Sequence, residues 1–187
     1  MVEAGMTQRA GPAELVAFWR EAGLDRWFTA DPAFDAACRA YRPLHEAAAR
    51  GELAAWEATP EGALALVLLL DQFPRNLFRG TPRAWATDAA ALAAAERALA
   101  RGHDRAIEPG LRIFLYMPLT HAEDRDLQER SVALFAALGL PVHLEAAIEH
   151  RDLIRRFGRF PHRNAVLGRP ETAAERDYLA GEGAFRG

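Results

Sequence analysis

The stretch GALALVLLLDQFPRNLFRG, residues 62–80, decides the fold. Its first half is apolar without interruption over residues 63–70, and it then runs directly into Asp71 and a proline, Pro74. A segment that is apolar on every face predicts a helix surrounded by other helices. Proline lacks a backbone N–H and disfavours the α conformation at the preceding residue. We therefore expect this helix to end or kink near Asp71, with Phe73 outside the α region.

The rest of the chain has the composition of helices and the residues that typically begin and end them. Ala, Leu, Arg and Glu dominate, prolines and glycines recur at helix-like intervals, and no alternating strand pattern is present. The pattern predicts an all-α protein of about eight to nine helices in antiparallel pairs, as a TPR-like α–α superhelix or a compact bundle. We expect one domain over residues 1–187, with loose tails at 1–11 and 182–187. The expected helices cover residues 12–22, 32–51 with a kink at Pro43, 60–72, 81–102, 112–118, 123–139, 141–158 and 172–181.

Composition excludes several classes of protein. The formal net charge is −3 and the pI is near 6.1, whereas general nucleic-acid and membrane-surface binders carry a basic excess. All 23 basic residues are Arg, so no P-loop or Schiff-base lysine is possible. The single Cys38 excludes an internal disulfide and suits a reducing compartment. With no signal peptide and no apolar run of ~20 residues, we predict a cytoplasmic protein with no membrane partner.

Asp71 is the first candidate functional residue. It follows the buried helix by less than one turn, and an unpaired buried carboxylate costs several kcal/mol, so it needs a cation. Arg75 and Arg79 are near in sequence, and Asp88 falls on the next helix. These residues are interpreted either as a structural ion-pair network that closes a helix end or as the lining of a pocket.

The second candidate segment is basic. Residues 150–169 contain six Arg against one acid, Asp152. The segment includes F-P-H-R-N at 160–164, which parallels F-P-R-N at 73–76, and each motif ends in one of the only two Asn of the chain, Asn76 and Asn164. Arginine binds carboxylate and phosphate in a bidentate manner. A solvated basic face is the alternative, and RNA binding is a weaker one because no aromatic stacking platform accompanies the charge.

Histidines supply the remaining candidates. His150 lies on the expected buried stripe of its helix, so it is either a core residue or a catalyst, and His162 lies within the second Phe-Pro motif. His121 and Glu123 follow Pro118. They suit a general acid and base, or simply the first turn of the next helix. No E-x-x-H or H-E-x-x-H motif occurs, so we expect no metal and no cofactor. The three polar segments are expected to converge at one end of the helical stack.

Three long motifs, LLLDQFPRNLFRG, YMPLTHAEDRDLQERSV and HRDLIRRFGRFPHRNAVLGR, resemble the bacterial domain-of-unknown-function family 924 over nearly the whole chain. The resemblance implies an all-helical fold similar to the tetratricopeptide superhelix and implies no activity. The chain lacks the 34-residue period and the W-x-x-L-G-x-x-Y signature of true tetratricopeptide repeats.

Two functions are consistent with these observations. The first is a pocket for an anionic small molecule of phosphate or carboxylate type, possessing acid-base groups. In this hypothesis the anion is held by Arg75, Asn76, Arg159, Arg163 and Asn164, and the proton-transfer candidates are Asp71, His121, Glu123, His150 and His162. The alternative is a TPR-like scaffold that binds a protein partner, with the polar motifs serving only to lock helix ends.

Overall fold

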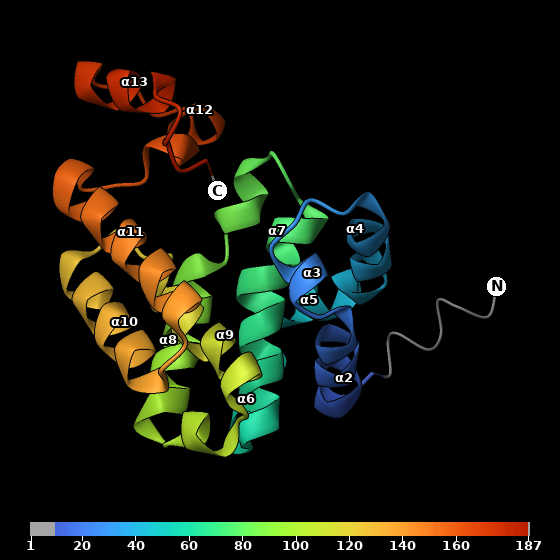
Figure 1. Ribbon diagram of the computed structural model, residues 1–187. Helices are drawn as coiled ribbons and strands as arrows, with labels where there is room; N and C mark the ends of the chain where they lie inside the picture. Colours follow the sequence, from blue (N-terminus) through green and yellow to red (C-terminus); the bar gives the residue numbers. More distant parts are fainter. Residues whose placement is uncertain (1–9, 187) are drawn as a thin grey trace. The chain divides into compact units, whose positions relative to one another are not determined.

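A computed structural model describes residues 10–186, and in this range the secondary structure is helical, with no β-strand (Figure 1). Nine of the α-helices in this range have seven or more residues, which confirms the predicted all-α class and helix number. The α-helices are α2 (Pro12–Ala22), α3 (Leu24–Trp27), α4 (Pro32–Cys38), α5 (Arg42–Ala49), α6 (Pro60–Val67), α7 (Phe73–Leu77), α8 (Asp88–Ala100), α9 (Pro109–Thr120), α10 (Arg125–Leu138), α11 (Pro141–Phe157), α12 (Asn164–Leu167) and α13 (Ala173–Ala180). The TPR-like arrangement stays a prediction.

The chain divides into two compact units. Of the described residues, the first unit contains 10–79 together with Arg83–Pro118, and the second contains Gly80–Pro82 and 119–186. The prediction of a single domain over residues 1–187 stays a prediction. Most of the predicted N-terminal tail and Gly187 lie outside the described residues.

In the first unit, α6 forms the centre of the core. Every residue from Gly62 to Val67 is buried, and α6 contacts α2, α8 and a short 3₁₀ helix, η2 (Ala54–Ala58). This confirms that neighbours surround the apolar helix. Thr59 caps it by accepting a hydrogen bond from the backbone N–H of Gly62, at 3.1 Å. The indole ring of Trp19, which is fully buried, packs against the rings of Phe73 and Phe114, with ring centres 5.3 and 5.5 Å away, in a tilted and an edge-on arrangement.

The helix does not end at Asp71 but widens into a π-helical turn, η3 (Leu68–Gln72), and continues as α7. Phe73 keeps α dihedral angles (φ −56°, ψ −39°), and its N–H donates to the carbonyl of Leu68. The prediction that Pro74 pushes Phe73 out of the α region is therefore wrong. The wider turn lets Pro74 stand in the first turn of α7, where a missing N–H costs little.

The π turn and Pro74 together free the carbonyls of Leu69 and Leu70 from their normal helical donors. Both carbonyls receive side-chain donors instead. His45 Nδ1 lies 2.8 Å from the Leu69 oxygen, and Thr87 Oγ1 lies 2.5 Å from the Leu70 oxygen. Since His45 donates through Nδ1, its tautomer is fixed. The wide turn thus depends on α5 and on the residue that precedes α8.

Two other boundaries differ from the predicted ones. The segment expected as one helix over 81–102 is a short 3₁₀ helix, η4 (Pro82–Trp85), followed by α8. Helix α9 is not broken at Pro118 and continues to Thr120. In the second unit, the amide of Gln128 donates to the backbone oxygens of Thr120 and Ala122 at 2.7 and 2.8 Å. These bonds supply donors to the carbonyl of the last residue of α9 and to a carbonyl in the loop that follows it.

In the second unit, α10 and α11 pack side by side as consecutive helices joined by Gly139–Leu140 (Figure 1). The buried residues Leu153, Ile154 and Phe160 form one hydrophobic cluster of this unit, against which Phe157, Tyr178 and Phe185 pack. The last described residues bond to α13, since the Phe185 N–H donates to the hydroxyl of Tyr178 at 2.7 Å. Among the described residues, no helix has the length and apolarity that a membrane span requires.

Candidate functional site

The ten candidate residues fall into the two units. Asp71, Arg75 and Asn76 belong to the first unit, and the other seven belong to the second. Those seven are His121, Glu123, His150, Arg159, His162, Arg163 and Asn164. The structure therefore brings together two of the three polar segments, the one after α9 and the one after α11. The expected convergence of these with the first segment stays a prediction.

In the first unit, Asp71 is buried within an ion-pair network. Its side chain is fully buried; one carboxylate oxygen accepts from Gln72 Nε2 at 2.6 Å and the other lies 3.7 Å from the Arg75 guanidinium. Arg75 in turn pairs with Asp88 at 2.8 Å and donates to the backbone oxygen of Ala84. The hydrogen bond from Gln72 and the nearby guanidinium of Arg75 are the kind of partners that a buried carboxylate needs.

Asn76 is also engaged within the first unit. Its Nδ2 donates to the backbone oxygen of Gln72 at 3.2 Å, and its Oδ1 lies 3.4 Å from the guanidinium of Arg79. Arg79 makes a bidentate pair with Asp35 on α4, at 2.9 and 3.0 Å. The amide of Asn76 thus spans the turn from η3 to the end of α7 and links it to a surface ion pair.

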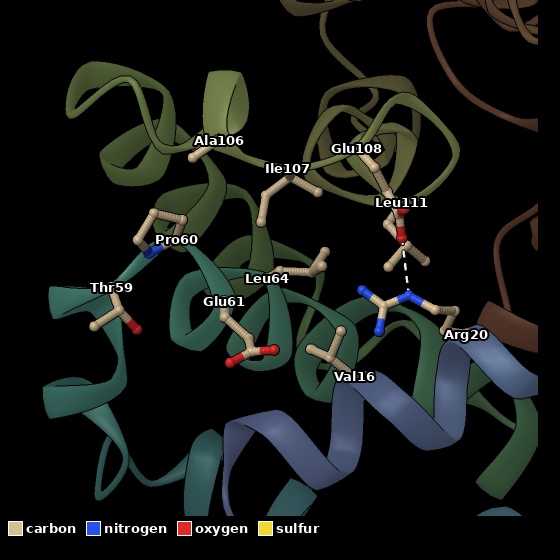
Figure 2. A pocket seen from close by; sticks show the side chains of 10 residues that line it. All are labelled: Val16, Arg20, Thr59, Pro60, Glu61, Leu64, Ala106, Ile107, Glu108 and Leu111. Carbon is tan, nitrogen blue, oxygen red and sulfur yellow. Dashed lines mark hydrogen bonds and ion pairs between the residues drawn. The ribbon is translucent and has the colours of Figure 1, made fainter.

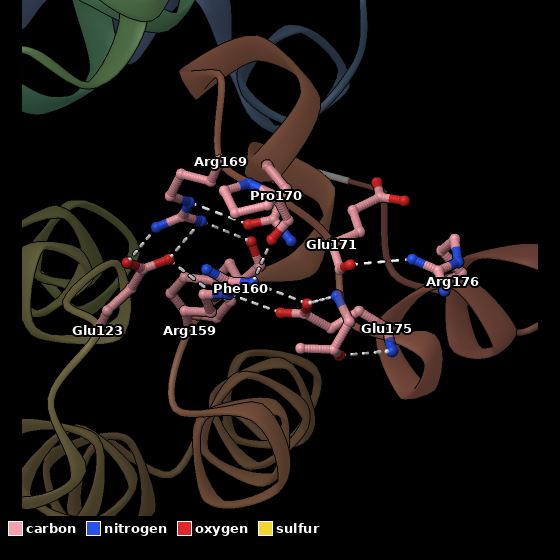
Figure 3. Close-up of polar contacts among 10 residues, drawn as sticks. Glu123, Arg159, Phe160, Arg169, Pro170, Glu171, Glu175 and Arg176 are labelled. Carbon is pink, nitrogen blue, oxygen red and sulfur yellow. Dashed lines mark hydrogen bonds and ion pairs between the residues drawn. The ribbon is translucent and has the colours of Figure 1, made fainter.

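In the second unit, a network of glutamates and arginines holds the loop that follows α11, residues 158–172, which contains Phe160 and Pro161 (Figure 3). Glu123 accepts a bidentate pair from Arg169, at 2.6 and 3.0 Å, and a 2.7 Å bond from the Phe160 N–H. Burial alone would raise the pKa of Glu123, but the bonds from Arg169 and Phe160 outweigh it and lower the pKa. Glu123 is therefore ionised at neutral pH, and both of its carboxylate oxygens already accept hydrogen bonds.

Arg169 reaches two further groups in the same loop. Its Nε donates to Oδ1 of the fully buried Asn164 at 2.9 Å, and it also donates to the backbone oxygen of Phe160 at 3.0 Å. Nδ2 of Asn164 has no acceptor within hydrogen-bond geometry among the described residues, although the amide helps to lower the pKa of Glu175. Asn164 thus lies between two ionised glutamates and orients the arginine that binds one of them.

Arg159 is held by a second buried carboxylate. Its guanidinium makes a bidentate pair with Glu175 at 2.6 and 2.8 Å and donates to the Pro170 oxygen at 2.7 Å (Figure 3). Glu175 also accepts from the Thr172 N–H at 2.7 Å in a capping box at the start of α13. The hydrogen bonds from Arg159 hold the pKa of Glu175 well below its usual value despite its burial. Arg159 therefore docks α13 onto the loop.

Two histidines of this unit, His150 and His162, lie against two phenylalanines, Phe160 and Phe185. The rings of His150 and His162 lie 5.4 and 5.7 Å from the ring of Phe160, and 4.5 and 5.0 Å from the ring of Phe185. The ring of His121 lies 6.5 Å from that of His150. His121, His150, His162 and Arg163 are called the histidine cluster below.

Two imidazoles of the cluster, those of His150 and His162, have lowered pKa values. Burial, together with the neighbouring charges of Arg163 and His121, lowers the pKa of His150 to about 4. Burial and the charge of Arg163 lower the pKa of His162 to about 3. His150 donates from Nδ1 to the backbone oxygen of Ala146 at 2.8 Å, so its Nε2 carries the lone pair that can accept a proton.

Arg163 supplies the positive charge of the cluster. It is 7% exposed, and its guanidinium carbon lies 4.6 Å from the centre of the Phe160 ring. Its charge lowers the pKa of Glu123 as well as those of His150 and His162, which places all three within its electrostatic reach. A buried cation beside neutral imidazoles favours the approach of an anion. Among residues 10–186, no group of three His, Cys, Asp or Glu side chains is arranged to hold a metal ion.

Sequence patterns did not single out three residues that complete this site. Glu175 was readable from the T-x-x-E capping signature at 172–175, which marks a helix start. Arg169 was counted only as part of the basic run, because its partner Glu123 lies 46 residues earlier. Phe185 falls in the segment expected to be loose. Patterns also gave no sign of a cavity in the first unit, between α2 and α6, which contains none of the ten candidates (Figure 2).

Comparison with known proteins places the chain in a family. No curated protein matches it. A solved structure of a protein of unknown function from Agrobacterium tumefaciens is 50% identical and has a TM-score of 0.88, with 90% of this chain and 96% of that chain covered. The sequence profile described as a bacterial protein of unknown function, DUF924, matches residues 15–183. The resemblance inferred from the three motifs is confirmed, and the chain belongs to the DUF924 family of bacterial proteins of unknown function.

Proposed function

We propose that the second unit binds a small anionic molecule, of phosphate or carboxylate type, at the histidine cluster. The observation that supports this proposal is that Arg163 and the rings of His150 and His162 lie around Phe160, with the ring of His121 next to that of His150. The guanidinium of Arg163 is largely shielded from water, so its attraction for a bound anion is stronger than it would be at an exposed site.

Each residue of the cluster has a role in this proposal. Arg163 attracts the anion, and the imidazoles of His121 and His162 donate hydrogen bonds to it. A bound anion would raise the depressed pKa of His150, so that Nε2 of His150 takes up a proton as the ligand enters. Acid-base catalysis on the bound ligand is thereby possible in chemical terms, with His150 as the proton carrier.

Other candidates have supporting roles. Arg159 and Asn164 hold the loop from Phe160 to Arg169 through Glu175 and Arg169, so they position Arg163 without touching the ligand. In the proposal, Asp71, Arg75 and Asn76 stabilise the π turn of the first unit. Phe185 packs on the imidazoles of His150 and His162, so a ligand that contacts both must displace that side chain.

The test is a thermal-shift and calorimetric titration with inorganic phosphate, acetate and a phosphate monoester, against chloride at equal ionic strength. An anion at ten times its Kd stabilises the protein by about 1.4 kcal/mol, which raises the Tm by about 3 °C in a chain of this size. Arg163→Ala should abolish the shift. Arg156→Ala is the matched control, because its guanidinium lies 4.6 Å from the ring of Phe157, the same distance as that from Arg163 to Phe160. Absence of any shift at millimolar anion, or an equal loss in both variants, would contradict the proposal.

The second candidate function is a protein-binding scaffold of TPR-like arrangement. Two observations favour it: the Arg75, Arg159 and Arg169 side chains all pair with carboxylates of the chain itself, and Leu24 and Phe28 are 61% and 50% exposed. In that case Asn164→Ala should lower the Tm, and no anion should stabilise the wild type. We also propose a cytoplasmic location, which the buried free thiol of Cys38 supports.

A further inference from the structure

The segment that follows α13, residues 181–186, places an aromatic ring against the histidine cluster. The ring of Phe185 meets those of His150 and His162 edge to face, with ring centres 4.5 and 5.0 Å away. Both imidazoles also contact the ring of Phe160, which is fully buried in the loop after α11. Each imidazole thus has one aromatic neighbour that is fully buried and one that comes from the segment after α13.

The segment after α13 is not helical, and most of its residues are exposed. Phe185 is partly buried, and its N–H donates to the hydroxyl of Tyr178 at 2.7 Å. Arg186 donates to the backbone oxygen of Leu179 at 3.0 Å. Exposed segments with few buried contacts open at a low cost in free energy. The ring of Phe185 can therefore leave the imidazoles while the buried ring of Phe160 stays in place.

With Phe185 in position, one ring nitrogen of His162 is left unsatisfied. Nδ1 of His162 is buried and has no hydrogen-bond partner among residues 10–186. A buried polar atom without a partner is unfavourable, and the phenyl ring of Phe185 has no group that bonds to it. In the tautomer that carries its proton on Nδ1, this nitrogen donates to an oxygen acceptor. A ligand that joins a ring to an anionic oxygen supplies what the phenylalanine side chain lacks.

Positive charge lies close to the same place. The charge of Arg163 lowers the pKa of both His150 and His162, so the guanidinium is within electrostatic reach of the imidazoles that Phe185 covers. Its guanidinium carbon is 4.6 Å from the centre of the Phe160 ring. A ring that takes the position of Phe185 therefore has a cation within reach of a negative substituent.

We propose that the anion bound at the histidine cluster carries an aromatic ring, and that this ring takes the place of Phe185 beside His150 and His162. The inference rests on the proposed anion site and adds the chemical class of its ligand, an aryl carboxylate or an aryl phosphate. The ring restores the edge-to-face contacts that Phe185 gives up, and the anionic group lies near Arg163. An aliphatic anion that displaces Phe185 leaves both imidazoles without that contact, so it binds more weakly.

The probes are benzoate with acetate, phenyl phosphate with methyl phosphate, and the uncharged benzamide. Ligand-observed NMR on the full chain should give each aryl anion a Kd at least about tenfold lower than that of its aliphatic partner, because the ring buries apolar surface. Phe185→Ala should lower the Kd of benzoate by about tenfold or more, since the tethered ring no longer competes for the position. Benzamide should gain by a similar factor, which separates the effect of the ring from that of the charge.

Tyr178→Phe tests the same competition with a smaller change. It keeps the ring of Tyr178 but removes the acceptor of the Phe185 N–H, so it should lower the Kd of benzoate by about fivefold, the equivalent of one hydrogen bond. Phe78→Ala is the matched control, because it also removes a partly buried ring beside an imidazole, that of His45 at 5.5 Å, in the first unit. It should leave benzoate binding unchanged.

The proposal is overturned if acetate binds as tightly as benzoate, or if Phe185→Ala and Phe78→Ala behave alike toward benzoate and benzamide. Both results leave the anion site itself standing. If none of the four anions binds to the wild type or to Phe185→Ala, the anion site fails, and the ligand class proposed here fails with it.

Discussion

Acidification should destabilise the protein through His150, and the size of the effect follows from its pKa. The folded protein holds that pKa at about 4, against 6.5 for the unpaired group. A histidine whose pKa is depressed by folding binds more protons when unfolded, so the free energy of unfolding falls as the pH drops below 6.5 and stops falling near pH 4. For these two values the loss between pH 7.5 and pH 5 is about 2 kcal/mol. His162 adds to the loss, but the two imidazoles repel each other when both are charged, so their contributions overlap.

The assay is urea unfolding at several pH values between 7.5 and 5, with wild type compared with His150→Gln. Glutamine keeps a donor and an acceptor but does not titrate, so the variant should lose about 2 kcal/mol less than wild type over this range. The window stays above pH 5 because Glu123 and Glu175, whose pKa values are lowered by folding, contribute stability that is lost only below about 4.5. A single cooperative transition is also needed, and it tests the expectation of one domain.

Two results would refute this reasoning. One is a parallel fall of both proteins between pH 7.5 and pH 5, which would mean that His150 does not carry the dependence. The other is an NMR titration in which the His150 ring signals of the folded protein move with a midpoint near 6.5. Either outcome would mean that water reaches the imidazole, and that Phe160 and Phe185 do not cover it as described.

Three other changes have defined outcomes. Thr87→Val should lower the free energy of unfolding by about 1–3 kcal/mol in urea titrations, because it leaves a buried carbonyl without a donor; Thr29→Val, which removes a bond to an exposed carbonyl, should cost less. Glu175→Gln should lower the urea midpoint, because it weakens the bidentate pair with Arg159 and leaves that cation without its carboxylate; an unchanged midpoint would show that the pair does not dock α13. Phe185→Ala should move the pKa of His150 upward toward 6.5 in an NMR titration, since removal of the ring readmits water.

Helix positions could be predicted wherever the signal is local. Thr59-Pro60 and the T-x-x-E box at Thr172 are caps formed by residues within one turn of each other, and both begin helices as expected. The π turn could not be predicted in the same way. Whether a helix ends at a proline or continues through it depends on donors for the carbonyls that lose their helical partners. Here the donors are His45 and Thr87, which are 24 and 17 residues from their acceptors.

The same distinction, between local signals and contacts of residues distant in sequence, applies to the candidate site. His150, His162 and Arg163 lie on one helix and the loop that follows it, so their proximity follows from the Phe-Pro motif. Contact between His121 and His150 depends on how α9 and α11 lead into the loops, and pairing of Glu123 with Arg169 depends on the path of the loop after Phe160. No pattern in one sequence encodes these distances. The cavity between α2 and α6 was missed because its floor consists of ordinary core residues.

The two side chains that donate to the π turn, His45 and Thr87, also constrain the order in which the chain can fold during synthesis. When Leu70 leaves the ribosomal exit tunnel, His45, the donor to the Leu69 carbonyl, has already left it. Thr87, the donor to the Leu70 carbonyl, is still to be synthesised or still inside the tunnel. The turn is then open to water on one side. Pulsed hydrogen exchange on stalled nascent chains should therefore show protection of the Leu68–Leu77 amides only in chains long enough to expose Thr87, and protection in shorter chains would show that the helix closes without it.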